Sequence, residues 1–150
     1  NLLGNESGRF RIVRLGEAGV AEVARLWKRH IADYPGYRTE YIELELAGGK
    51  FDRSPVLLDW GRVAGFLLLS FDKDLARIPA EAIDPGARNG WTAAALNIAA
   101  AAEVRMRAVR NIQFEWRAGT RYTSKLARRL GGTVIRELRQ VTRPAAGQPV

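Results

Sequence analysis

The stretch IDPGARNGWTAAAL, residues 83–96, has the composition of a loop that can hold an anion. Gly86 and Gly90 keep its backbone approachable, and Arg88 adds positive charge. Thr92 can cap a helix or donate to a phosphate oxygen. Because the first N–H groups of a helix lack internal partners, a loop of this kind predicts a phosphate or pyrophosphate site. The alternative is a simple strand-to-helix turn.

The residue inventory removes several classes of chemistry. The chain of 150 residues has no cysteine, which excludes a disulfide framework, a thiolate nucleophile and a thiolate zinc site. A single histidine, His30, argues against a multi-histidine metal site and a serine–histidine triad, so no metal is expected. His30 itself is expected on the surface of a helix.

The net charge of +8 is concentrated in one part of the chain. Residues 103–143 hold eleven Lys or Arg against three acids, whereas the remainder is neutral. This asymmetry indicates an anionic partner such as nucleic acid, a membrane surface or a phosphorylated cofactor, or else a solvated arginine-rich surface. The apolar runs are too short to span a bilayer and the first residues do not read as a secretory signal, so a cytoplasmic protein without membrane contact is expected.

The elements that must position the loop follow from hydrophobic periodicity. In the first half, the pattern predicts a strand over 9–15, a helix from Glu17 to about Asp33, and a hairpin of 55–60 with 63–71. Residues 39–47 fit either a strand or, as we favour, a short helix ended by Gly48 and Gly49. Residues 75–83 predict a further strand, in which Pro79 implies an edge, a bulge or a break in pairing.

The second half predicts a long helix over 91–109, a strand over 112–116, a helix over about 120–130 and a strand over 133–142. The mixed order favours an α/β domain with helices packed on a mixed sheet. We expect a flexible N-terminus over 1–8, a single domain over 9–143 and a disordered tail over 144–150.

This order of elements, over residues 9–143, resembles the GNAT-type N-acetyltransferases. The family has a hydrophobic residue, a proline and an arginine before its glycine-rich loop, followed by an aliphatic helix. The corresponding positions here are Ile83, Pro85, Arg88, Ala93 and Leu96. The resemblance implies a GNAT-like mixed, mostly antiparallel sheet of about six or seven strands flanked by about four helices.

The resemblance also implies acetyl-coenzyme A as the cofactor, with its pyrophosphate at the N-terminus of the 91–109 helix. Its pantetheine arm would lie where the fourth and fifth strands of the family fold splay apart. The expected cofactor-binding residues are Ala82, Ile83, Arg88, Asn89, Gly90, Trp91, Thr92 and Ala93.

Two departures from the family pattern stand out. The usual inner glycine of the loop is Trp91, whose side chain either closes the approach to the pyrophosphate or leaves the task to Gly90 in a shifted register. The family's catalytic tyrosine would fall on Ala127, by register from the LGG motif at 130–132. Tyr122, more than a helical turn earlier, is the only tyrosine of that segment and the candidate general acid.

Acetyl transfer to an amine requires a base for the amine proton and polarisation of the thioester carbonyl. Glu81 lies two residues before Ile83 and shares its face of the strand, which makes it the first candidate base, unless it is an ordinary exposed glutamate. Backbone N–H groups near Ala80 to Ala82, freed by a bulge, are candidates for the polarisation.

Candidate acceptor-binding residues are Tyr34, Tyr37 and Tyr41, which either line a pocket or complete the core. Glu115, between Phe114 and Trp116, joins them if it is not simply paired with an arginine. The predicted function is acetyl-CoA-dependent N-acyl transfer to an amine of a small molecule or peptide, by direct attack in a ternary complex. The alternative is a non-catalytic GNAT-fold protein whose basic half contacts nucleic acid or a protein partner. The oligomeric state stays open, with a homodimer among the possibilities.

Overall fold

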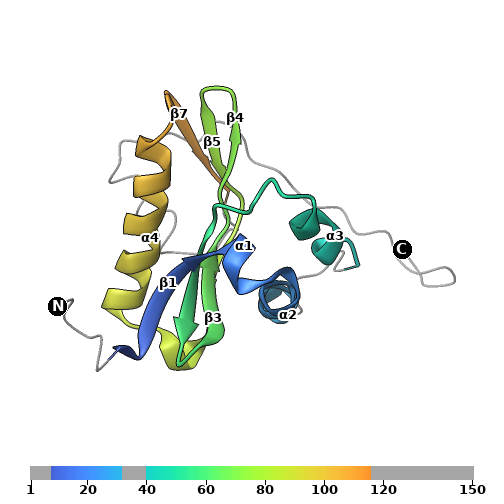
Figure 1. Cartoon of the computed structure of the whole chain (residues 1–150), viewed down its shortest axis with the longest axis vertical. Helices are drawn as coiled ribbons and strands as arrows, with labels where there is room; N and C mark the ends of the chain where they lie inside the picture. The colour runs from blue at the N-terminus through green and yellow to red at the C-terminus, as the bar shows by residue number, and fades with distance from the viewer. Residues whose placement is uncertain (1–7, 32–39, 116–150) are drawn as a thin grey trace, which may run out of the picture.

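The computed structural model describes residues 8–31 and 40–115 (Figure 1). The first elements are β1 (Phe10–Arg14), α1 (Leu15–Ala18), α2 (Val20–Ile31), α3 (Ile42–Ala47), β2 (Pro55–Asp59) and β3 (Arg62–Leu67). They are followed by β4 (Ser70–Asp72), β5 (Leu75–Ile78), β6 (Glu81–Ile83), a 3-10 turn (Pro85–Ala87), α4 (Gly90–Arg105) and β7 (Asn111–Phe114). The predicted helix over 120–130, the strand over 133–142 and the tail over 144–150 lie outside the described residues.

The strands form two short sheets that continue into one another. The first has the order β1-β2-β3-β6 and is antiparallel throughout, whereas the second has the order β4-β5-β7 with β5 and β7 parallel. The chain runs from β3 into β4 and from β5 into β6, so the two sheets share two continuous strands. The expected mixed, mostly antiparallel sheet of an α/β domain is confirmed.

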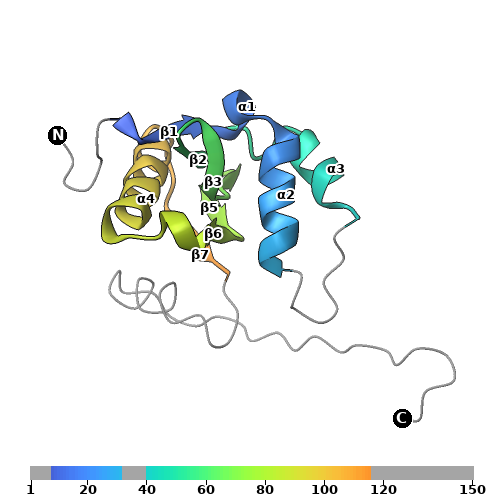
Figure 2. The ribbon, with the colours of Figure 1, turned by 90° about the horizontal axis from the view of Figure 1, so that it is seen from below.

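Helices cover the two faces of this sheet, as Figure 2 shows, with α4 on one side and α1 to α3 on the other. One core lies between the sheet and α2 and α3, and includes Trp27 and Phe66 in an edge-to-face contact at 6.2 Å between ring centroids. The second core lies under α4 and includes Leu67, Leu96 and Ala100. The alanines of α4 permit close approach to the sheet, because their side chains add little bulk.

Several predicted elements are confirmed with changed boundaries. The strand expected over 9–15 is β1, and the short helix favoured over 39–47 is α3. The helix expected from Glu17 to Asp33 is instead two helices, since Gly19 at φ 92° lies in a conformation that glycine adopts and other residues avoid. The long helix ends at Arg105, earlier than expected.

The strand expected over 63–71 is broken at Leu68 and Leu69. Buried Ser54 lies at this break: its hydroxyl accepts from Leu69 N at 2.8 Å and donates to Leu69 O at 3.2 Å. The side chain of Ser54 thus satisfies backbone groups that a regular ladder would pair. The strand expected over 75–83 is likewise two strands, β5 and β6, separated at Pro79 and Ala80.

Candidate functional site

The break between β5 and β6 is a β-bulge. Leu68 donates its N–H to Ala80 O at 2.8 Å, whereas Ser70 pairs with Arg77. The two steps from Leu68 to Ser70 therefore lie opposite three steps from Arg77 to Ala80, so the second strand carries one extra residue. Of the options left open for Pro79, the structure shows the bulge.

This bulge changes which side chains face α4. Strict alternation after Ile78 would place Ala80 and Ala82 on the α4 face. With the extra residue, both alanines pack instead into the core under α2. Ile83 packs into the α4 core, and Glu81, two positions before it, shares that face. The expectation that Glu81 and Ile83 share a face is confirmed.

The backbone of β6 presents an open edge. Antiparallel pairs alternate between hydrogen-bonded and non-hydrogen-bonded. Asp84 N donates to Ala64 O at 2.7 Å and Leu68 N to Ala80 O, so Glu81 and Ile83 occupy the non-bonded positions. Their N–H and C=O groups therefore point away from β3. Among the described strands, none pairs with β6 on that side.

The parallel pair β5 and β7 stops where this open edge begins. Its ladder ends at Ile78 opposite Phe114, with one further bond from Glu115 N to Ile78 O at 3.0 Å. Within residues 40–115, the pairing of β7 does not extend to β6. The exposed backbone of β6 thus starts directly beyond the last pairing of β7 with β5.

A tight loop leads from β6 into α4. The Asn89 side chain accepts from Thr92 N at 2.8 Å, and the Thr92 hydroxyl accepts from Asn89 N at 3.1 Å, which is a capping box. The same hydroxyl donates to Ala87 O at 2.8 Å. Thr92 is fully buried, so of its two expected roles the structure shows the one within the helix cap.

The capping leaves two donors at the start of α4. Thr92 N is bonded to Asn89, and Ala93 N reaches Asn89 O at 3.4 Å. In the described part of the chain, nothing accepts from the N–H groups of Gly90 and Trp91, which open the helix. These N–H groups lie at the positive end of the α4 dipole, where an anion is stabilised.

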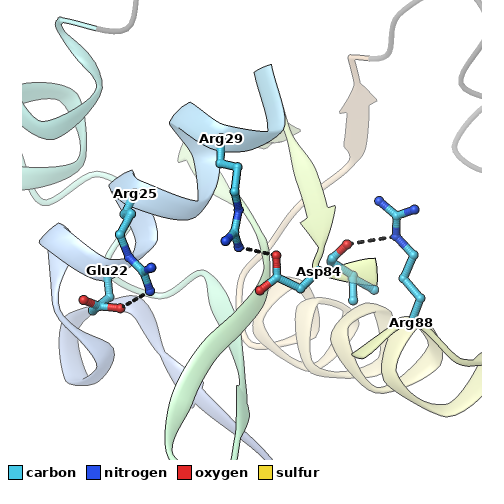
Figure 3. Close-up of polar contacts among 6 residues, drawn as sticks. Glu22, Arg25, Arg29, Asp84 and Arg88 are labelled. Carbon is cyan, nitrogen blue, oxygen red and sulfur yellow. Dashed lines mark hydrogen bonds and ion pairs between the residues drawn. The ribbon is translucent and has the colours of Figure 1, made fainter. Parts of the chain in front are cut away.

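Arg88 is exposed and directed by the backbone of β6. Its Nε donates to Ile83 O at 2.9 Å, which uses one of the outward carbonyls of β6 (Figure 3). The terminal guanidinium nitrogens extend beyond this bond. Arg88 therefore places positive charge beside both the open edge of β6 and the N-terminus of α4.

The residue before the loop is tied to the opposite helical layer. Arg29 of α2 forms an ion pair with Asp84, whose backbone continues the β3–β6 ladder (Figure 3). Beside this pair lies an open hollow of about 460 Å³. It is lined by Arg9, Arg29, Asp59, Ala64, Asp84, Pro85, Gly86 and Ala87. The arginines of this hollow are paired with its aspartates, so we do not place the expected pyrophosphate site there.

Trp91 does not stand over the loop. Its indole is stacked on Phe10 of β1, with 5.6 Å between ring centroids and 30° between planes, and it packs against the α4 core. The indole N–H is buried and has no hydrogen-bond partner in the part of the chain that the structure describes. Trp91 thus fixes the first turn of α4 on the sheet, while its own backbone N–H stays at the helix start.

Glu81 has the electrostatics of a base that works near neutral pH. Burial raises the pKa of Glu81 to about 7, against a smaller opposing effect of a hydrogen bond from the Asn97 side chain. Glu81 is partly buried on the face of β6 that it shares with Ile83. A carboxyl group with a pKa near 7 can take up and release a proton at physiological pH.

The other predicted site residues are less fully placed. Tyr41 is 56% exposed and precedes α3, and Glu115 is exposed at the end of the described chain. Tyr34, Tyr37 and Tyr122 lie outside the described residues. His30 is on the exposed side of α2, as expected.

Two features of the site were absent from the sequence analysis. One is the contact of Asn97 with Glu81, for which the signal was a single polar residue in an apolar helix. The other is the Arg29–Asp84 ion pair, which joins residues 55 positions apart and has no local signal.

Within residues 8–31 and 40–115, no cluster of three or more His, Cys, Asp or Glu is arranged to hold a metal ion. The helices in that part of the chain are all too short or too polar to cross a membrane.

The fold is that of the GNAT-type N-acetyltransferases, as comparison with solved structures shows. The aminoglycoside N-acetyltransferase AAC(6')-Iy, in complex with CoA, matches with a TM-score of 0.67 and 13% identity, over 95% of this chain and 100% of that chain. Ard1 from Thermoplasma volcanium matches with a TM-score of 0.65 and 21% identity, over 82% of both chains.

A third match is the ribosomal-protein-alanine N-acetyltransferase from Brucella melitensis biovar Abortus 2308, with a TM-score of 0.61 and 16% identity, over 89% of this chain and 97% of that chain. By sequence, no family model and no curated protein matches the chain. At these identities the likeness defines the fold, and the activity has to be argued from the site.

Proposed function

We propose that the chain is an acetyl-CoA-dependent N-acyltransferase that moves an acetyl group to an amine by direct attack in a ternary complex. One observation carries the proposal: the open edge of β6 is followed by the N–H groups of Gly90 and Trp91, which have no acceptor among the described residues, and Arg88 lies between the two. A ligand with an amide-containing arm and a diphosphate matches this order of donors, and coenzyme A has both.

The described residues fit such a ligand. The diphosphate is assigned to the N–H groups of Gly90 and Trp91 and to the guanidinium of Arg88, with Asn89 holding the turn. The outward backbone of Ile83 and Glu81 is assigned to the arm. Ala82 and Ala93 complete the strand and the helix start. When bound, acetyl-CoA supplies an activated acetyl thioester. The CoA present in the crystal structure of AAC(6')-Iy supports this assignment.

Glu81 is the proposed general base. An amine must lose a proton to become an amide, and a carboxylate with a pKa near 7 accepts that proton at neutral pH. The N–H of Glu81 itself points to the open edge, where it can donate to the oxygen of the thioester carbonyl. Tyr122 is the proposed general acid that returns a proton to the departing thiolate.

The acceptor is proposed to be a primary amine of a small molecule or a peptide. The structural neighbours include aminoglycoside acetyltransferases, one of them in complex with sisomicin, and a ribosomal-protein-alanine N-acetyltransferase. Tyr34, Tyr37, Tyr41 and Glu115 are the proposed acceptor-binding residues. Tyr41 and Glu115 are both exposed, as contact with an incoming amine requires.

The test has two stages. Isothermal titration calorimetry of the full chain with CoA should give saturable binding in the micromolar range, and no heat with adenosine alone. A thiol-release assay with acetyl-CoA and a panel of aminoglycosides, polyamines and N-terminal peptides should then give turnover with at least one amine. Absence of binding at millimolar CoA contradicts the proposal.

The basic segment supports a second candidate, a non-catalytic protein of the same fold. The excess of Lys and Arg over residues 103–143 suits binding to nucleic acid or an acidic protein. This candidate predicts retention on a DNA column that falls steeply with salt, without binding of CoA.

A further inference from the structure

The middle of helix α4 carries a single polar residue, Asn97. From Ala93 to Ala102 the chain consists of alanine, leucine and isoleucine, except for Asn97. Asparagine is a poorer helix former than alanine. Asn97 is also partly buried. A polar residue in this place therefore requires a partner that the fold supplies.

The amide of Asn97 is held in place from within its own helix. Its Nδ2 donates to Ala93 O at 2.9 Å, one turn earlier. An amide nitrogen carries two hydrogens, so this bond leaves a second donor on the same atom. The Asn97 side chain is also close enough to Glu81 to lower the pKa of its carboxyl group. One amide group is therefore anchored on the helix backbone and acts on the carboxyl group of β6.

The bulge at Pro79 makes this contact possible. Because it turns Glu81 toward α4, the carboxyl group meets the helix rather than the α2 core. Without the extra residue, Ala82 would occupy that face and Asn97 would face an alanine. The bulge thus sets the face on which Glu81 lies, and Asn97 lies on the helix that covers this face.

Other charged groups around Glu81 are engaged elsewhere or exposed. Arg88 bonds Ile83 O, and Glu103 of α4 pairs with Arg14 and Arg53. Among residues 8–31 and 40–115, the remaining titratable groups on the adjoining strands and loop are Arg77 on β5, Asp84 beyond β6 and Glu115 beyond β7. Arg77 and Glu115 are exposed, and Asp84 is paired with Arg29. The side chains packed on the same face are apolar, including those of Leu67 and Ile78.

We propose that Asn97 is a positioning residue for Glu81: its amide, anchored on Ala93, orients the carboxyl group and stabilises its charged form. That Glu81 is the base rests on the proposed function, whereas the contact itself does not. Burial alone drives Glu81 toward the protonated state, in which it cannot accept a proton. By donating to the carboxylate, Asn97 keeps the charged form accessible at neutral pH.

The direct test is the titration of Glu81 in the Asn97→Ala variant. Carbon-13 NMR of the glutamate side-chain carboxyls follows this titration, and the Glu81→Gln variant assigns the resonance. We expect the midpoint to rise by about one pH unit when Asn97 is replaced, since the amide donor that favours the carboxylate is lost. The Asn97→Gln variant keeps the donor and should recover part of the shift. An unchanged midpoint in Asn97→Ala overturns the proposal.

A control separates this effect from a general effect on α4. Ile98 is the next residue and is 65% exposed, so Ile98→Ala should leave the Glu81 midpoint unchanged. In acetyl transfer, Asn97→Ala should move the acidic limb of kcat/KM by the same amount and in the same direction. A uniform loss of activity without a moved limb contradicts the positioning role. If CoA does not bind but the NMR midpoint moves, the proposed function fails and the Asn97–Glu81 coupling stands.

Discussion

The indole of Trp91, at the start of α4, is stacked on the ring of Phe10 of β1. A large side chain in a loop that the family keeps small raises the question of whether it blocks the ligand. The stacking answers it, because the indole is directed toward the sheet and the N–H groups of Gly90 and Trp91 remain at the start of the helix. Trp91 is a packing residue whose backbone also belongs to the proposed CoA site.

Replacement of Trp91 by alanine tests this role. We expect Trp91→Ala to lower the free energy of unfolding by about 2–3 kcal/mol, because the contact with Phe10 is lost. The affinity for CoA should stay equal or fall, as the first turn of α4 loosens. Urea denaturation and calorimetry measure the two effects. Tighter CoA binding in Trp91→Ala would show that the indole obstructs the site.

Glu81→Gln should separate binding from chemistry. Loss of the base should lower kcat by about 10²- to 10⁴-fold with little change in CoA affinity. The proposed mechanism requires the carboxylate form of Glu81, whose pKa is about 7, so kcat/KM of the native chain should rise with pH through this value. Steady-state kinetics between pH 5.5 and 9 give both results. A native profile that is flat across pH 7 argues against Glu81 as the base.

Glu81→Gln should lower kcat, but at alkaline pH it should raise the stability of the fold. The pKa of Glu81 is raised in the folded chain, so folding favours the protonated carboxyl group. The contribution of this group to the free energy of unfolding is fully present below its unfolded pKa of about 4.5 and is lost as the pH rises through 7. Above pH 7 the cost reaches at most about 3 kcal/mol. Glu81→Gln should therefore be more stable than the native chain at pH 8 and similar at pH 4.5. Thermal unfolding at the two pH values checks this, and equal differences at both would contradict it.

Arg88→Ala should weaken CoA binding by about 10- to 100-fold, the contribution of one hydrogen bond between charged groups. The stability should change little, since the side chain is exposed. Arg25→Ala is a matched control, because Arg25 is an exposed arginine paired with Glu22 on α2 (Figure 3). Calorimetry that finds the same loss in both variants would show only a general effect of charge.

The cap of α4 offers a test in which stability and binding separate. Asn89→Ala should lower the free energy of unfolding by about 1 kcal/mol, because Thr92 N loses its acceptor. Asn89→Asp keeps an acceptor there and should preserve stability. Its negative charge should nevertheless repel the diphosphate and reduce CoA affinity by about tenfold or more. Equal CoA affinity in the native chain and Asn89→Asp would place the diphosphate elsewhere.

Much of the fold could be predicted from local pattern. Alternation of side chains located β1, and two β-rich runs joined at Gly61 located the β2–β3 hairpin. Helix propensity favoured α3, and an alanine-rich apolar run indicated α4. The breaks were harder to place. The interruption at Leu68 and Leu69 depends on Ser54, and the bulge at Pro79 depends on the register of the facing strand. Pro79 indicated that strand pairing would change at this position, but it did not indicate whether by an edge, a bulge or a break.

The site was predictable to a similar degree. The loop and the face of Glu81 followed from spacing along the chain. The direction of Trp91 did not, because it is set by Phe10, 81 positions earlier. Asn97 was passed over because its partner Glu81 lies 16 positions away, on an element whose facing direction depends on the bulge. Contacts between elements decided what the local sequence left open.

The proposed function requires that the N–H groups at the start of α4 bind the diphosphate of coenzyme A. A titration of the nitrogen-15-labelled full chain with CoA, followed by amide NMR, tests this binding residue by residue. We expect the largest saturable shifts at Gly90 and Trp91, with smaller shifts at Glu81 and Ile83, and their loss in Arg88→Ala. Saturable binding that leaves Gly90 and Trp91 unshifted, or no binding at millimolar CoA, would contradict it.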